Sequence, residues 1–469
     1  MLQPKKEKRN LMRGLLAMPA RLITLSFLTL IAVGTLLLSL PVASRGGSSI
    51  GLVKAFFTAT SATCVTGLVT VDTATHWSLF GQIVILALIQ AGGLGIVTIT
   101  TFFFVLARRK IGFKAMIVAQ ESTASLRFSD VMKLVRRVVL ITMTIEVVGA
   151  AVLATRFVPA FGWSRGIFKS IFHAVSAFCN AGFDLMGNTD SGPYSSLVAW
   201  NGFPVVLLTI AVLFILGGLG FIVINSFVEY RKTRSIPYHA RLVLFLTGVF
   251  LVTGMAFFLL AEYNNTASGA MGTLPAGQRF LAAFFQSATP RTAGFNSIDQ
   301  ASLTGSSKIV TILLMFVGAA PGSTGGGIKV TTFAMLIAAV FAELRGYEYP
   351  VLLRHRIARA VFNKAFLILS LGFFTVLVTT VGMTFTERAL LASGGTTVLD
   401  LLFEAVSAFG TVGLSAAGTP NLSQGSWLLL TVSMIVGRVG PASFAISLLQ
   451  GPRSDTRDMV FPEGRCIVG

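Results

Sequence analysis

Four short segments of this chain repeat one pattern, and each lies between two long apolar runs. They read FTATSATCVTGL, FHAVSAFCNAGF, FFQSATPRTAGF and FEAVSAFGTVGL, they align without a gap, and we call them the four glycine segments. Their shared glycines are Gly67, Gly182, Gly294 and Gly413. A fourfold repeat of helix, short segment, glycine and helix is what one chain needs to place four equivalent loops around one axis.

The composition predicts a protein that crosses a membrane as helices. Of its 469 residues, 54% are hydrophobic and only 12% are charged, whereas soluble domains carry about 25% charged residues. Apolar runs such as Leu22 to Val42 and Val205 to Phe227 are long enough to span the hydrocarbon core as helices. Because these runs are continuous rather than alternating, helices are favoured over a closed barrel.

The repeat predicts an all-α polytopic fold with eight transmembrane helices. Each repeat is expected to hold a first helix, a short segment, a loop and a last helix. The short segments are about 12 residues long, too short to span, so they are expected to enter the membrane and turn back as pore helices in a pseudo-fourfold arrangement. The four repeats are expected at residues 22–106, 137–227, 241–343 and 364–449.

Within the repeats, each kind of helix has its expected positions. The first helices are expected at 22–42, 137–157, 241–261 and 364–388. The short segments are expected at 52–63, 166–178, 277–289 and 397–409. The last helices are expected at 79–106, 200–227, 307–343 and 426–449.

The net charge of +19 is distributed in a way that indicates membrane topology. Most Lys and Arg residues lie in five segments that alternate with the glycine segments, at 1–21, 107–137, 229–241, 343–364 and 450–469. The positive-inside rule places all five in the cytoplasm, with the basic N-terminus and the C-terminal tail. We therefore expect no nucleic-acid partner. The run from Leu22 to Val42 is too long for a signal peptide and is expected to be the first transmembrane helix.

The loops that end the glycine segments are candidates for an ion selectivity filter. Glycine permits the positive φ angles that a loop needs to point its backbone carbonyls at an ion, and carbonyl rings can replace the hydration shell of potassium. The C-terminal ends of the short helices would also favour a cation at the centre. The filter candidates are Thr63, Cys64, Val65, Thr66, Gly67, Cys179, Asn180, Ala181, Gly182, Arg291, Thr292, Ala293, Gly294, Gly410, Thr411, Val412 and Gly413.

The last helix of the third repeat is interrupted, and this interruption is a candidate gate. Proline and five glycines cannot continue a helix, and the string lacks the ending of a phosphate-binding loop. The alternative is an unstructured kink. The candidate gate residues are Gly318, Ala319, Ala320, Pro321, Gly322, Ser323, Thr324, Gly325, Gly326, Gly327 and Arg438.

Arg438 is a charge inside an otherwise apolar helix, where it is costly and is expected to face the interior. It could donate to carbonyls of the candidate gate, or it could pair with Glu343 or Glu404. It lies in a glycine cluster that recurs as Gly92-Gly93-Leu94-Gly95 and Gly217-Gly218-Leu219-Gly220. Such clusters allow close helix packing or bending, and packing is the expectation here.

Several motifs resemble those of the Trk/Ktr/HKT superfamily of potassium transporters, most closely the bacterial Ktr membrane subunit. They are SATCVTGL (61–68), TPRTAGFN (289–296), PGSTGGGIK (321–329), GRVGP (437–441) and FPEGRCIVG (461–469). The resemblance covers nearly the whole chain. It implies four fused two-helix pore units, with the third-repeat loop as an intramembrane gate that the arginine matching Arg438 contacts. It also implies that the side chain of Arg291 points away from the pore.

The resemblance carries further expectations that the residues themselves do not supply. It implies potassium as the transported ion, held by backbone carbonyls of the filter, with uptake that depends on or is stimulated by sodium. It also implies a homodimer in the lipid of a bacterial cell membrane and a cytoplasmic ring of nucleotide-binding regulatory subunits.

Two other classes of function fit this sequence less well than a potassium-translocating subunit. An alternating-access secondary transporter that moves a cation with a solute usually shows inverted repeats and ionisable groups at the midplane. A membrane enzyme would need clustered His, Asp or Glu, and the four histidines of this chain form no such cluster. We therefore expect neither an enzyme nor an organic cofactor. The three cysteines have no spacing that suggests a disulfide or zinc site.

Overall fold

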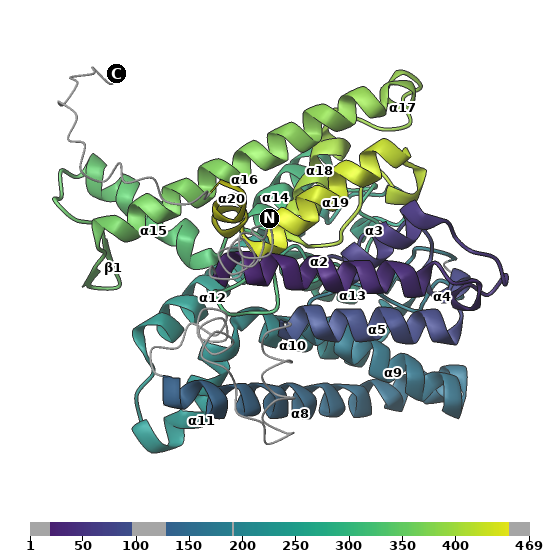
Figure 1. Cartoon of the computed structure of the whole chain (residues 1–469), viewed down its shortest axis with the longest axis horizontal. Helices are drawn as coiled ribbons and strands as arrows, with labels where there is room; N and C mark the ends of the chain where they lie inside the picture. The colour runs from purple at the N-terminus through teal and green to yellow at the C-terminus, as the bar shows by residue number, and fades with distance from the viewer. Residues whose placement is uncertain (1–18, 96–127, 190–191, 450–469) are drawn as a thin grey trace, which may run out of the picture.

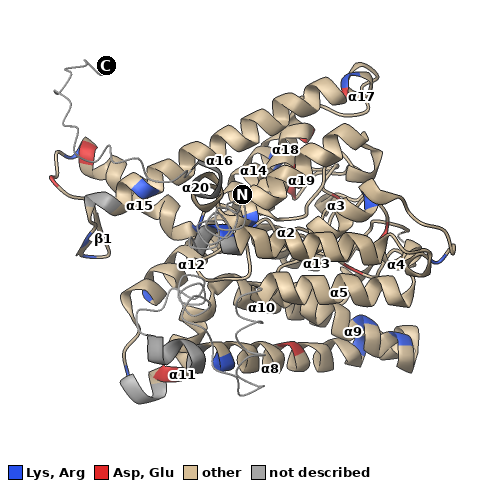
Figure 2. Cartoon of the chain, in the orientation of Figure 1, with Lys and Arg blue, Asp and Glu red and all other residues tan. Residues whose placement is uncertain are grey.

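The computed structural model describes residues 19–95, 128–189 and 192–449, and the expectations for 1–18, 96–127 and 450–469 lie outside the described residues. Long helices dominate the described part, and a short antiparallel hairpin joins β1 (Val351–Leu352) to β2 (His355–Arg356). Figure 1 shows α2, α5 and α8 running side by side, with α16 crossing the opposite edge of the molecule. Figure 2 shows α2 and α5 almost free of charged side chains.

The first helix of every repeat forms close to its predicted position. The observed first helices are α2 (Pro19–Leu38), α8 (Phe128–Phe161), α12 (Tyr238–Glu262) and α16 (Arg359–Thr386). The parts Val135–Phe161, Tyr238–Glu262 and Val361–Thr386 are each long and apolar enough to cross a membrane. Large apolar side chains on these helices stay exposed, such as Leu260 and Phe374. Such an exposed apolar surface suits contact with lipid rather than water.

The short helices lie inside the molecule, each packed against the first helix of its own repeat. They are α3 (Leu52–Thr63), α9 (Trp163–Phe178), α13 (Ala276–Ala288) and α18 (Val398–Gly410). Their bounds differ from the predicted ones by no more than three residues. All four bury a phenylalanine almost completely at an equivalent position, namely Phe57, Phe172, Phe285 and Phe403. These side chains anchor the short helices in the core.

The last helices differ from the prediction, because all four end or break at an equivalent place. The last helices are α5 (Leu79–Leu94), α10 (Pro204–Leu219) with α11 (Phe221–Thr233), α14 (Gly305–Phe316) with α15 (Val330–Leu344), and α19 (Gln424–Val439) with α20 (Pro441–Leu449). The expectation of continuous helices at 200–227 and 426–449 was wrong. The chain between α10 and α11 turns by 96°.

A single glycine ends or breaks three of the four last helices. Gly95 caps α5, and Gly220 and Gly440 join the two halves of the second and fourth last helices, with φ angles of 78°, 87° and 91°. Positive φ is accessible to glycine and ends a right-handed helix. The glycine clusters therefore bend the chain, and they also allow close packing. A side chain at Gly92 or Gly217 would collide with the carbonyl of Thr63 or Phe178 at the end of a short helix.

Shorter elements lie between the helices of each repeat. They are η1 (Pro41–Ala43), α4 (Thr73–His76), η2 (Val198–Trp200), η3 (Met271–Thr273), α17 (Arg388–Ala392) and η4 (Thr419–Asn421). On length and composition, three described helices are able to span a membrane, or four if the bent pair α10 and α11 is one span. Among the other last helices, α5, α14 and α15 are shorter apolar helices. The count of eight spans thus depends on joining the halves of each broken helix.

Candidate functional site

The four shared glycines meet at one place in the structure. A side chain added at Gly67 would collide with Gly182, one at Gly182 with Gly294, and one at Gly413 with Gly67. A side chain added at Gly294 would collide with the carbonyl of Val412, the residue before Gly413. The four loops therefore close a ring in chain order, with no room for a β-carbon at any of the four positions. We call it the glycine ring.

The backbone of each loop has a positive φ angle at two positions, and the sequence predicted only the one at the glycine. The glycines of the ring have positive φ angles of 94°, 68°, 79° and 95°. The residue two positions earlier also has a positive φ in every loop, although none of these residues is glycine. They are Val65, Asn180, Thr292 and Thr411. A non-glycine residue with positive φ is uncommon and marks a functional constraint or strain.

Side chains of the short helices hold the ring loops in place. The Ser61 hydroxyl accepts from the amide of Gly67, and the Ser407 hydroxyl accepts from the amide of Gly413, both at 3.1 Å. In the second and third repeats, Ser176 and Thr289 donate to carbonyls just after the glycine, at 2.6 and 2.7 Å. One side-chain hydroxyl thus holds the backbone of each loop through a hydrogen bond.

The gap-free alignment of the four segments is wrong by one residue in the helical part of the third. Phe285, not Phe284, takes the buried phenylalanine position, and Thr289 takes the position of the serines. The amide of Ala293 reaches back four residues to the carbonyl of Thr289, whereas that of Thr66 reaches back five to Ser61. One residue is therefore missing between the helix and the loop. From Thr292 to Gly294 the predicted register holds.

With the corrected register, a buried polar residue follows the anchoring phenylalanine in every repeat. In three repeats this side chain forms hydrogen bonds with residues that follow the ring glycine in the sequence. His173 Nε2 accepts from the amide of Leu185, Gln286 Nε2 donates to Gln300, and Glu404 binds Ser415 and Thr419. The sequence alone does not reveal this set, because the register of the third segment is shifted at Gln286 and the four residue types differ.

A pocket of about 240 Å³ opens above the glycine ring, on the side from which the short helices enter. We call it the vestibule. All four ring glycines line it, together with the carboxyl groups of Asp72, Asp184 and Asp299. No Lys or Arg is among its lining residues, although burial, with a smaller contribution from the charge of Asp72, raises the pKa of Asp184 to about 7. The vestibule therefore presents mainly negative charge to the ring.

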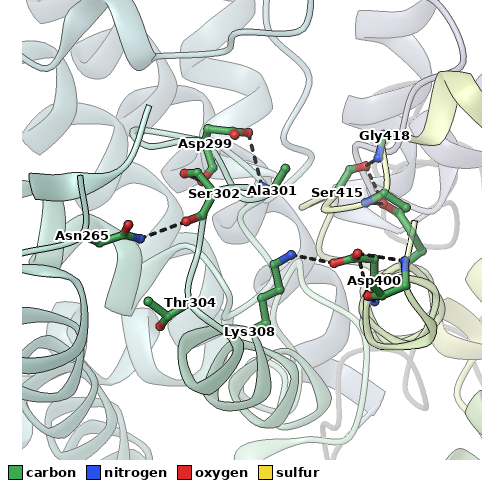
Figure 3. A network of polar contacts seen from close by, with 12 residues as sticks. Asn265, Asp299, Ala301, Ser302, Thr304, Lys308, Asp400, Ser415 and Gly418 are labelled. Atoms are coloured by element: carbon green, nitrogen blue, oxygen red, sulfur yellow. Dashed lines mark hydrogen bonds and ion pairs between the residues drawn. The ribbon is translucent and has the colours of Figure 1, made fainter. Parts of the chain in front are cut away.

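A salt bridge ties two repeats together beside the vestibule, as Figure 3 shows. Lys308 at the start of α14 lies 2.7 Å from a carboxylate oxygen of Asp400 at the start of α18. Asp400 also accepts from the hydroxyl of Thr397 and completes a capping box. The side chains are only 13% and 10% exposed. This contact fixes the fourth short helix against the last helix of the third repeat.

Directly on the other side of the glycine ring lies the segment of residues 317–329, which joins α14 to α15. It folds back on itself, because Val317 pairs with Ile328 and the amide of Gly318 donates to the carbonyl of Ile328 at 2.8 Å. The amides of Ala320 and Thr324 donate to the carbonyls of Gly218 and Gly217. The segment is therefore ordered by the helices around it, which is contrary to an unstructured kink.

The segment 317–329 touches the ring loops at the residues with positive φ. The amide of Gly326 donates to the hydroxyl of Thr411 at 3.0 Å. The side-chain amide of Asn180 lies within hydrogen-bond distance of the hydroxyls of Thr292 and Thr324, at 3.0 and 3.2 Å. A side chain at Gly325 would collide with Thr292. The segment therefore lies across the inner side of the ring loops.

Arg438 joins this segment to the first repeat. One terminal nitrogen donates to the carbonyl of Thr324 and the other to the carbonyl of Gly92. The carboxylate of Glu404 is bound by hydroxyls and an amide of its own repeat instead. The structure therefore agrees with the expected contact between Arg438 and the candidate gate, and not with a pairing of Arg438 with Glu404. Lys329 Nζ adds a bond of 2.6 Å to the carbonyl of Gly325 within the segment.

The remaining sequence candidates lie outside the ring. Arg291 turns away from it, since its guanidinium donates to Thr247 on α12 at 3.2 Å and lies over the ring of Phe250. The expected orientation of this side chain is confirmed. Cys64 and Cys179 are buried free thiols at the ends of α3 and α9. No cluster of His, Cys, Asp and Glu suited to a metal occurs in the described residues.

Comparison with known proteins places the chain among membrane transporters for cations. The family model of TrkH, a cation transport protein, matches residues 16–454. The chain is 37% identical to the Ktr system potassium uptake protein B of Bacillus subtilis, over 96% of this chain and 97% of the relative. It is 38% identical to the potassium/sodium uptake protein NtpJ of Enterococcus hirae, over the same shares.

A solved structure has the same fold. The crystal structure of the potassium transporter TrkH from Vibrio parahaemolyticus matches with a TM-score of 0.67 at 19% identity, over 91% of this chain and 83% of that one. At this identity the likeness concerns the fold alone. Together with the family model, which spans nearly the whole described chain, it agrees with the expected resemblance. This chain belongs to the TrkH family of cation transport proteins, whose members are transporters and not enzymes.

Proposed function

We propose that this chain is the potassium-translocating subunit of a potassium uptake system, with one ion path per chain. The single observation that carries the proposal is the glycine ring, in which four loops from four repeats meet with no space for side chains. The relatives named as potassium or potassium/sodium uptake proteins supply the ion. The path runs from the vestibule through the ring to the opposite side of the membrane.

The glycine ring acts as the selectivity filter in this proposal. The carbonyls of Thr66, Ala181 and Val412 contact the neighbouring glycine of the ring, so backbone oxygens gather there. Such oxygens replace the hydration shell of a potassium ion. The short helices end just before the loops, and their C-terminal ends favour a cation. The filter comprises the loop residues that the sequence identified, without the side chain of Arg291.

The segment 317–329 acts as the gate. It lies across the inner side of the ring loops and is held by Arg438, whose positive charge also opposes a cation near the path. The fold then has eight spans in pseudo-fourfold order, with each broken last helix counted once. The basic segments face the cytoplasm, so the vestibule faces outward across a bacterial cell membrane. The Ktr likeness supports a homodimer, a regulatory ring of nucleotide-binding subunits and a role for sodium.

The substitution Gly67→Ser tests the filter. Gly67 has a φ of 94° and faces Gly182, so a serine there is both strained and crowded. The added side chain must displace the ring carbonyl of Ala181, and a loss of about 1.4 kcal/mol in the binding of potassium relative to sodium corresponds to roughly a tenfold change in ion preference. We expect potassium uptake, in cells that lack other uptake systems, to lose its preference over sodium by about that factor.

The control is Gly47→Ser, a glycine with a φ of 67° and nothing within 4 Å of its missing β-carbon. It carries the same backbone strain without the crowding of the ring. Equal ion preference in the wild type and Gly67→Ser would remove the ring from the ion path. Uptake that requires a co-transported solute would favour an alternating-access transporter instead.

A further inference from the structure

We propose that a pocket between α5 and α9, on the outer rim, binds the phosphodiester headgroup of an anionic phospholipid. The pocket measures about 310 Å³ and is separate from the vestibule. Three cationic side chains line it, from the loop before α3, from the first turn of α9 and from the next turn. They are Arg45, Arg165 and Lys169. No carboxylate is among its lining residues.

Lys169 is the most constrained of the three. Its side chain is 6% exposed, and its ammonium bonds to the amide oxygen of Asn188 at 2.8 Å and lies 3.7 Å from the ring centre of Phe161. The carboxylates of Asp184 and Asp72 act on it from the vestibule side without a salt bridge. A buried ammonium whose direct contacts are all neutral is costly. An anion in the pocket would give this charge a partner.

The two arginines have guanidinium N–H groups that are able to bind a further acceptor. Arg45 uses Nε for a bond of 3.2 Å to the carbonyl of Trp77, which leaves its terminal nitrogens for another acceptor. Among the described residues, neither Arg45 nor Arg165 forms a salt bridge with a carboxylate. Arg165 thus lines the pocket without a carboxylate partner. Two guanidinium groups and an ammonium match a phosphate, which accepts bidentate hydrogen bonds.

The surface beside the pocket fits acyl chains. Leu79 and Ile83 on α5 are 61% and 49% exposed, and Ile167 and Ile171 on α9 are 41% and 44% exposed. Trp163 at the start of α9 is 77% exposed, as expected for an aromatic anchor at a membrane interface. Cations next to apolar helix faces suit a phospholipid better than free phosphate, because only the lipid satisfies both.

Thermal unfolding of the purified full chain in detergent tests the site. Titration with dioctanoyl-phosphatidylglycerol should raise the melting temperature in a saturable way, more than dioctanoyl-phosphatidylcholine or sodium phosphate does. Arg165→Ala should weaken phosphatidylglycerol binding by about tenfold or more, because charge-assisted hydrogen bonds are lost. Native mass spectrometry should count one fewer retained phosphatidylglycerol per chain in the double variant Arg45→Ala/Arg165→Ala.

Arg388→Ala is the matched control, because Arg388 is also a cation on the outer side and does not line the pocket. It should bind phosphatidylglycerol like the wild type. Equal stabilisation by the two lipids would overturn the proposal, and so would undiminished phosphatidylglycerol binding by Arg165→Ala. Stabilisation by sodium phosphate that equals that of phosphatidylglycerol would show a site for free phosphate instead. None of these results depends on potassium uptake, so the proposed ion path is tested separately.

Discussion

The last helices of the second and third repeats break at an equivalent place but in different ways. Between α10 and α11 one glycine, Gly220, turns the chain by 96°. Between α14 and α15 the break takes the whole of 317–329, which reaches under the glycine ring. A single glycine redirects a helix and leaves nothing beneath the ring. The longer segment places hydrogen-bonding backbone there, so in the proposed function closure of the path comes from one repeat and not from a fourfold device.

Removing the third-repeat segment should have the largest effect on transport. A deletion of residues 320–326 shortens the segment and removes its contacts with Asn180, Thr411 and Arg438. Several hydrogen bonds of about 1 kcal/mol each, one of them charge-assisted, are lost. We expect rubidium flux per folded molecule in proteoliposomes to rise by more than about tenfold.

The comparison with the single-glycine breaks supplies the control for this deletion. Gly440→Ala adds a β-carbon where nothing lies within 4 Å, at a φ of 91°. It strains the break of the fourth repeat without touching the ring, so flux should stay near that of the wild type. A similar rise in both variants would mean that any disturbance of the breaks opens the path, and the contrast between the repeats would fail.

Sequence patterns predicted most of this architecture, and the parts they missed have physical causes. The short helices were predicted to within three residues, since long apolar runs and glycines bound them. The sign of a φ angle is invisible in a sequence, so Gly220 and Gly440 were compatible with straight, closely packed helices. The adjacent Phe284 and Phe285 both fit the repeat, and only burial shows which one anchors the helix.

The substitution Arg438→Ala should have the next largest effect. It removes the donors to Thr324 and Gly92, which tie the third-repeat segment to the first repeat. Loss of a charge-assisted bond of about 1.5–3 kcal/mol raises the population of the open segment by about tenfold or more. The rise in flux should not exceed that of the 320–326 deletion. Ion preference should not change, because the filter lies elsewhere. Rubidium flux and potassium–sodium competition measure the two effects.

Arg438→Lys sharpens this result, since one ammonium cannot reproduce the two-pronged geometry of a guanidinium. It should give flux between those of the wild type and Arg438→Ala. Lowered thermal stability without any rise in flux would instead make Arg438 a structural residue.

The substitution Thr411→Val should have the smallest effect. It keeps the shape of the side chain and removes one hydrogen bond, of 3.0 Å, from the amide of Gly326. A neutral bond of about 1 kcal/mol predicts a rise in flux of roughly fivefold or less. Thr60→Val is the control, because the Thr60 hydroxyl is buried without a partner. In the background of the 320–326 deletion, Thr411→Val should add nothing, and an unchanged effect there would contradict a contact between the two.

The central claim is that a potassium ion passes through the glycine ring. Crystals of the protein grown with thallium or rubidium in place of potassium test it by anomalous scattering. We predict a peak on the axis of the ring, at the level of the carbonyl oxygens of Thr66, Ala181, Ala293 and Val412. Crystals of transport-competent protein that show anomalous peaks elsewhere and none at the ring would contradict the account.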